Sequence, residues 1–164
     1  MAEASKTLGR ALRLTIAGDG PDRQRLIELA GTCGVPADFV GWVDRSRRLE
    51  VLRKADLVAV PSLWPEPFGL TGLEGFCLGV PAVGYAVGGV PDWLIPGETG
   101  ELAEGESPSV RGLAAALVRA LSDPDRYARL SAGAWQFTRR FALDAHIATL
   151  EPLLDQAKER ALSV

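Results

Sequence analysis

Two glutamates flank a glycine-containing segment near the middle of the chain. Glu66 and Glu74 stand on either side of Gly69 and Gly72. The pattern predicts a helix from about residue 71, and the first N–H groups of a helix lack intrahelical partners and carry partial positive charge, which favours a phosphate-sized anion. Ionised glutamates accept hydrogen bonds from hydroxyl groups. The segment therefore indicates a ligand with hydroxyl groups on both sides of its phosphates, such as a nucleotide sugar.

The other reactive side chains predict structural roles. His146 is the only histidine and falls in the carboxy-terminal helical region, where we expect a surface or packing role. Cys33 and Cys77 form no metal-binding spacing and are expected to be small core residues. Asp123 precedes Pro124, a pattern typical of a helix start. We therefore expect no metal site.

Aromatic and basic side chains near the glutamates offer further contacts. Four tryptophans could stack on a base or a sugar: Trp42, Trp64, Trp93 and Trp135. Trp64 is the best candidate because it lies beside Glu66, and packing within a lid is an equally plausible role for it. A solvated helix face is the expected role of the basic cluster Arg45, Arg47, Arg48, Arg53 and Lys54. In residues 18–23, Arg23 replaces the third glycine of a dinucleotide-binding pattern, so this segment predicts a strand-to-helix turn.

Composition restricts the class of protein. The 164 residues are 47% hydrophobic and 24% charged, which is typical of one globular domain and excludes a largely disordered chain. The net charge of −3 provides no global basic field, so we expect no nucleic-acid partner. Residues 1–13 lack the apolar core of a secretory signal, and glycines and prolines interrupt the longest uncharged run, residues 75–91. We expect a cytoplasmic location.

Short apolar runs alternate with helical periodicity along the chain. The predicted strands are residues 12–17, 39–43, 57–60, 81–86 and 99–103, and helices are predicted between them and after residue 105. The helix from residue 22 is expected to bury Leu26, Leu29 and Cys33, and strand 57–60 to be covered on both faces. This alternation predicts an α/β fold, a Rossmann-like α/β/α sandwich with a mainly parallel sheet and a helical tail. The core would span about 12–121 and the last helices about 124–161. The loops after residues 17, 43, 60 and 86 would share one rim.

Several ordered motifs between residues 12 and 103 resemble one family. The run from Ser62 to Gly79, with Glu66-Pro67-Phe68-Gly69 followed by Glu74, resembles the signature of the retaining glycosyltransferases of the GT-B fold, family 4. Five further motifs occur in that family's order: residues 17–21, 39–41, 55–57, 88–92 and 97–100. The resemblance implies the carboxy-terminal, nucleotide-sugar-binding domain of such an enzyme.

The resemblance also implies roles for individual residues. Glu74 would hold the ribose hydroxyls, and Glu66 would contact the transferred sugar as the catalytic residue. The diphosphate and the sugar would lie against backbone amides at Phe68, Gly69, Leu70 and Thr71. The base would lie against Val43, with Arg48 nearby, and the rim beside the site would be shaped by Gly88 and Gly89. The reaction would need no metal and no cofactor.

The resemblance further implies parts that have no counterpart in this sequence. These are an amino-terminal acceptor-binding domain, and an earlier strand and helix that supply an arginine and a lysine for the diphosphate. We therefore expect the 164 residues alone to bind donor weakly and to transfer nothing. Membrane contact would occur only through the missing parts, and the acceptor is not readable from the sequence. Two alternatives stay open: a nucleotide-sugar epimerase of the same architecture, and a non-catalytic nucleotide-diphosphate-binding module.

Overall fold

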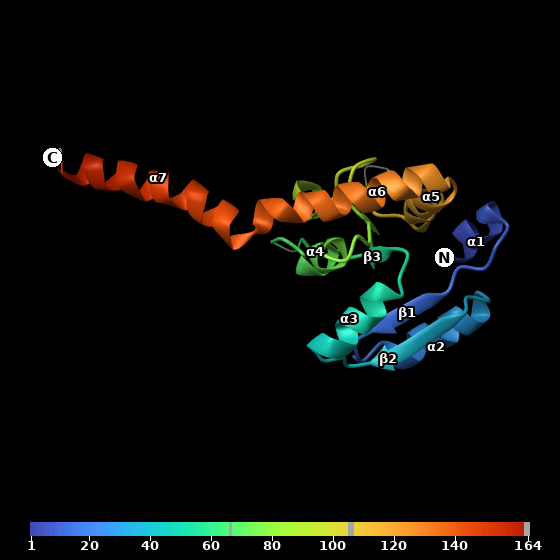
Figure 1. The fold of residues 1–164 in the computed structure, drawn as a ribbon. Helices are drawn as coiled ribbons and strands as arrows, with labels where there is room; N and C mark the ends of the chain where they lie inside the picture. Colours follow the sequence, from blue (N-terminus) through green and yellow to red (C-terminus); the bar gives the residue numbers. More distant parts are fainter. Residues whose placement is uncertain (66, 105–106, 163–164) are drawn as a thin grey trace.

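The computed structural model describes residues 1–65, 67–104 and 107–162. Within these residues short strands alternate with helices, and the chain ends in a series of helices (Figure 1). The elements before the first long loop are α1 (Ala2–Leu8), β1 (Leu14–Ala17), α2 (Arg23–Thr32), β2 (Ala37–Gly41), α3 (Arg45–Arg53) and β3 (Val58–Val60). Those after it are α4 (Leu70–Phe76), β4 (Ala82–Gly84), η1 (Val90–Asp92), β5 (Gly100–Leu102), α5 (Val110–Leu121), α6 (Pro124–Phe137), η2 (Thr138–Phe141) and α7 (Leu143–Leu162).

The strands pair in parallel, as the alternation of strands and helices predicts. They form two sheets instead of one, with strand orders β1-β2 and β3-β4-β5. Strand β2 ends two residues earlier than predicted because Gly41 turns the backbone to a φ of +70° and leaves Trp42 85% exposed. The fold class is confirmed, and the division of the sheet is a feature that periodicity did not predict.

The three-stranded sheet is covered on both faces. One apolar cluster joins β3 and β4 to α4, η1 and α6 through Phe76, Trp93 and Leu94, none of which is exposed. A second cluster joins Val83 of β4 to α1, α5 and α6, with Ala116 and Leu130 fully buried. The hypothesis that Trp93 stacks on a ligand is wrong, because its ring lies inside the first cluster.

The two-stranded sheet carries no comparable core. No residue from 13 to 51 is buried. The predicted buried face of α2 is wrong, since Leu26 is 39% and Leu29 51% exposed. Both cysteines are exposed, so their predicted core positions are wrong as well. The prediction that strand 57–60 is covered on both faces is wrong at Ala59, the exposed middle residue of β3, whereas Val58 and Val60 are buried.

The helical tail has a packed part and a projecting part. Asp123 caps α6 by accepting a hydrogen bond from the backbone N–H of Asp125, which confirms the predicted helix start. Helix α7 extends away from the rest of the molecule (Figure 1). Its apolar side chains are exposed, with Ile147 40% and Leu154 59% accessible. His146 is exposed on the same helix, as expected.

Candidate functional site

The segment that contains the two glutamates follows β3 at the carboxyl edge of the three-stranded sheet. Gly69 is the N-cap of α4 and adopts a left-handed conformation, with φ 80° and ψ 71°, which explains the need for glycine. Helix α4 begins at Leu70, one residue before the predicted start. Leu70 is 67% exposed and Thr71 is also exposed, so this helix start faces the surface. Glu66 lies outside the residues that the structure describes.

A buried tryptophan fixes the loop that leads into α4. The indole Nε1–H of Trp93 donates a 2.5 Å hydrogen bond to the carbonyl oxygen of Phe68. Gly72 makes room for the indole, since a Cβ at that position would lie 2.2 Å from the ring. The sequence offered Trp93 as a stacking residue, but the structure makes it the anchor of this loop. The sequence signal for this anchoring role was the position of Trp93 in the glycine-rich segment after β4.

The glycine pair after β4 also contacts this loop. A Cβ at Gly89 would lie 2.2 Å from the carbonyl oxygen of Pro67, so only glycine permits this close approach. Gly88 is exposed and has a φ of +57°. The structure therefore brings the predicted rim residue Gly89 against Pro67 and Phe68. It supports the expectation that the loops after β3 and β4 share one rim.

Glu74 lies one turn into α4 and meets a side chain from α3. Its Oε1 is 2.9 Å from Nη2 of Arg48, and the two side chains are 35% and 41% exposed. Helix α3 is oriented by Asp44, whose side chain accepts a 2.7 Å hydrogen bond from the backbone N–H of Arg47. The partly buried Val43 precedes this cap. The structure thus joins Glu74 to Arg48, two predicted site residues that are 26 positions apart (74 − 48).

A second rim feature lies after β1, where the sequence predicts a turn. Asp22 is the N-cap residue of α2, so the segment from β1 to α2 forms the predicted strand-to-helix turn. Arg23 donates a 3.1 Å hydrogen bond to the carbonyl oxygen of Phe39, and its guanidinium lies 5.7 Å from the centre of that ring. A cavity of about 320 Å³ adjoins these residues and Ile16. Arg23 therefore packs α2 on β2.

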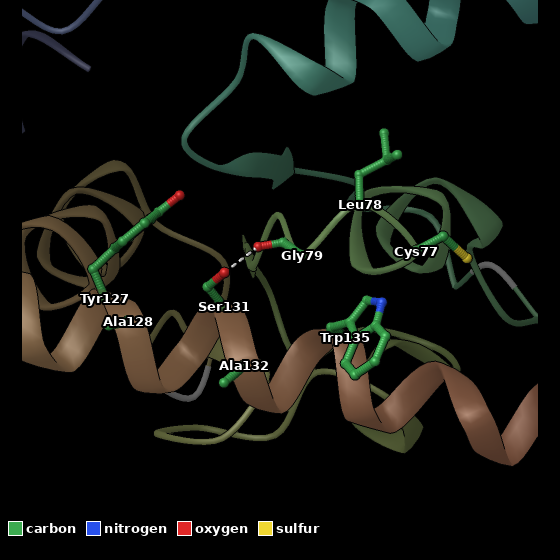
Figure 2. A pocket seen from close by; sticks show the side chains of 8 residues that line it. All are labelled: Cys77, Leu78, Gly79, Tyr127, Ala128, Ser131, Ala132 and Trp135. Atoms are coloured by element: carbon green, nitrogen blue, oxygen red, sulfur yellow. Dashed lines mark hydrogen bonds between the residues drawn. The ribbon is translucent and has the colours of Figure 1, made fainter.

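A depression of about 650 Å³ lies at the other end of α4. Figure 2 shows Cys77 and Gly79 on one side of it and Tyr127, Ser131 and Trp135 of α6 on the other. The Ser131 hydroxyl donates a 2.6 Å hydrogen bond to the carbonyl oxygen of Gly79. Burial raises the pKa of Tyr127, and the negative charge of Asp56 raises it further. Trp135, one of the four possible stacking residues, lines this depression, but none of the residues predicted to bind the donor does.

The family comparison covers most of the chain. The profile of the family described as "Glycosyl transferases group 1" matches residues 1–137. A D-inositol 3-phosphate glycosyltransferase of Thermobispora bispora is 38% identical over 148 residues, which are 88% of this chain and 34% of that protein. A glycogen synthase of Mycobacterium tuberculosis is 40% identical over 113 residues, which are 68% of this chain and 27% of that protein. The chain thus spans about a third of the length of these relatives.

Solved structures with the same fold include a sucrose-phosphate synthase from Thermosynechococcus elongatus. It is 27% identical, has a TM-score of 0.73, and is matched over 97% of this chain and 42% of its own. Anabaena Alr3699/HepE, solved in complex with UDP and glucose, is 21% identical with a TM-score of 0.74, over 94% of this chain and 44% of its own. The second likeness shows a shared fold. In the part of the chain that the structure describes, no helix has the length and apolar character to cross a membrane.

Proposed function

Because this chain belongs to the glycosyl transferases group 1 family, we propose that it is the nucleotide-sugar-binding half of a GT-B glycosyltransferase. In the intact enzyme it would hold a nucleotide-diphosphate sugar while the sugar moves to an acceptor hydroxyl bound by other parts of the protein. The observation that carries this proposal is the pairing of Glu74 with Arg48 beside the glycine-capped start of α4.

The ion pair with Arg48 leaves Glu74 able to accept a hydrogen bond from a ribose hydroxyl. A carboxylate has two acceptor oxygens, and Arg48 engages Oε1. Oε2 can then accept a hydrogen bond from a ribose hydroxyl, while the guanidinium holds the carboxyl group in orientation. The side chain is 35% exposed, which leaves it accessible to a ligand on the rim. Arg48 thus acts through Glu74 as a positioning residue in this proposal.

The diphosphate would lie against the backbone from Phe68 to Thr71. Trp93 and Gly89 hold this segment in place, so its N–H groups need little rearrangement on binding. Helix α4 has only seven residues, and the dipole of an exposed helix start contributes about 0.3–1 kcal/mol toward a bound anion. That contribution is small for a ligand with two phosphates. We therefore predict weak donor binding by this chain alone and no transfer.

The finer features of the reaction remain part of the proposal. Glu66 would contact the transferred sugar, Val43 the base, and Gly88 would shape the rim beside them. Transfer of a hexose with retention and without a metal, in the cytoplasm, is what the resemblance implies. The relatives carry the names of a glycosyltransferase and a glycogen synthase. These names favour sugar transfer over the epimerase and over the non-catalytic module.

A nucleotide titration tests the ribose contact directly. UDP is the first nucleotide to try, because a fold neighbour was solved with it, and GDP and ADP follow. Each is titrated calorimetrically together with its 2′-deoxy form against the natural full-length protein. We expect the ribonucleotide to bind about tenfold more tightly than the deoxy form, a difference typical of a lost hydrogen bond to a charged group. Glu74→Ala should remove this preference.

Two variants complete the titration. Glu50→Ala removes an exposed glutamate that pairs with Arg47 in α3, and it should leave both affinities unchanged. Glu66→Ala should lower transfer while leaving UDP affinity close to that of the parent protein. A Glu74→Ala protein that still discriminates between the ribo and deoxy forms would contradict the proposed site.

A further inference from the structure

The side chain of Phe68 connects the rim loop to a distant part of the chain. Phe68 precedes the glycine cap of α4, and its ring is partly buried and packs against the apolar cluster around Phe76 and Trp93. The centre of the ring lies 5.6 Å from that of Phe141, at an interplanar angle of 66°. This is the edge-to-face arrangement that aromatic pairs prefer. Phe68 thus contacts a residue that is 73 positions away (141 − 68).

Phe141 lies at the turn between the packed helix α6 and the projecting helix α7. It is the last residue of η2, and Ala142 after it has an extended backbone, with φ −65° and ψ 142°. In Figure 1 the chain changes direction there, beside the loop that leads into α4. The match to the family profile ends at residue 137, so membership of the family assigns no role to Phe141.

A series of aromatic contacts leads from Phe141 back to the same loop. Its ring centre lies 5.5 Å from that of Phe137, which is 4% exposed. Phe137 lies 6.2 Å from Phe76 of α4, and Phe76 lies 5.5 Å from Trp93. The indole of Trp93 then donates its hydrogen bond to the carbonyl oxygen of Phe68. These five residues form a closed circuit that begins and ends at Phe68.

The two ends of this circuit hold different parts of Phe68. The hydrogen bond from Trp93 holds the carbonyl group, and the edge-to-face contact with Phe141 holds the ring. With both attachments the residue is fixed in direction as well as in position, whereas one attachment alone leaves it free to rotate. The N–H groups of residues 68–71 therefore depend on both attachments for their direction. A segment that is already ordered loses less conformational freedom when a ligand binds.

We propose that Phe141 is a positioning residue for the diphosphate: its ring holds Phe68 so that the N–H groups from Phe68 to Thr71 are directed at the ligand. The identity of the ligand rests on the proposed function, whereas the geometry rests on the aromatic contacts alone. The donor site then depends on η2, the short helix that joins α6 to α7.

Hydrogen exchange at the indole of Trp93 tests the geometry without any ligand. It is measured by NMR on this chain. Trp93 is fully buried, so its indole N–H should be protected, and Phe141→Ala should accelerate its exchange about tenfold, the scale of a lost aromatic pair. The amide of Ala82, which donates to Thr99 at 3.2 Å, reports the stability of the sheet and should accelerate less than about threefold. Equal acceleration at both groups, or an unchanged indole, would overturn the proposal.

Two further variants separate the ring of Phe141 from the packing of η2 in general. Phe141→Tyr keeps the ring, and its hydroxyl can be hydrated because the side chain is 48% exposed, so the indole should exchange as in the parent protein. Arg140→Ala removes a guanidinium that lies 4.7 Å from the centre of Phe137 in the same turn. It should also leave the indole protected. Equal effects of Arg140→Ala and Phe141→Ala would overturn the specific role of Phe141.

Calorimetric titration of the natural full-length protein with UDP tests the consequence for binding. Phe141→Ala should weaken UDP about tenfold, and Phe141→Tyr should restore the affinity. The preference for UDP over its 2′-deoxy form should persist in Phe141→Ala, because that preference depends on Glu74. Unchanged UDP affinity in Phe141→Ala, or loss of the ribose preference, would overturn the proposal. A parent protein that binds none of UDP, GDP and ADP would instead contradict the proposed function, and the indole exchange, which needs no nucleotide, keeps the two failures distinct.

Discussion

The β3–β4–β5 half and the β1–β2 half share one sequence pattern and differ in burial. In the first half, Trp93, Phe76 and Leu130 are fully buried, because helices cover both faces of its sheet. In the second, no residue from 13 to 51 is buried, although α2 has a helical apolar period. The comparison shows that hydrophobic periodicity predicts which face of a helix or strand is apolar. It does not predict whether another element packs on that face.

The largest expected contrast comes from truncating one apolar side chain in each half. Trp93→Ala should lower the free energy of unfolding by about 3–5 kcal/mol, because it empties a filled core position and removes the bond to Phe68. Leu29→Ala, at a side chain 51% exposed, should cost less than about 1 kcal/mol. Urea unfolding measures both. Equal losses would show that the β1–β2 half is packed as tightly in solution as the other half.

Sequence patterns predicted much of this fold because they are local. The Asp123 cap follows from the residues at the start of α6, and the parallel strands follow from the alternation of short strands and helices. The exposed face of α2 and the division of the sheet depend on packing between elements that are far apart in the sequence, which periodicity does not report. The same holds for the site. Glycines marked the rim loop, but only the folded chain shows that Arg48 reaches Glu74 and that Trp93 holds Phe68.

Removing one charged side chain from each half should give a smaller difference in the free energy of unfolding. Glu101 on β5 is 2% exposed and is held by Arg119 and Arg126. Glu101→Ala should lower the free energy of unfolding by about 1–3 kcal/mol, because buried donors lose their acceptor while the arginines can partly rehydrate. Asp38→Ala breaks an exposed pair with Arg13 in the other half and should cost at most about 1 kcal/mol. A larger loss for Asp38→Ala in chemical denaturation would reverse the ranking of the two halves.

The Arg48–Glu74 pair connects the helix after β2 to the densely packed half. A double-mutant cycle with Arg48→Ala and Glu74→Ala should give a coupling free energy of about 0.2–1 kcal/mol, since both side chains are more than a third exposed. The coupling should shrink at high salt, because screening weakens accessible ion pairs. Thermal and urea unfolding of the four proteins supply the values. A coupling free energy above about 2 kcal/mol would show that this ion pair stabilises the fold more than its exposure predicts.

The smallest expected effect is confined to alkaline pH and tests how α6 packs near the start of β3. Burial, and secondarily Asp56, raise the pKa of Tyr127 in the folded protein, so the neutral phenol is favoured there. Its contribution to stability is fully present below the unfolded pKa of about 10 and is lost as pH rises through the folded value. Tyr127→Phe, compared with the parent by urea unfolding across this range, should lose stability less steeply with pH. Parallel pH profiles for the two proteins would mean that the hydroxyl group of Tyr127 is hydrated, and that the groove between α4 and α6 is more open than the packing described above.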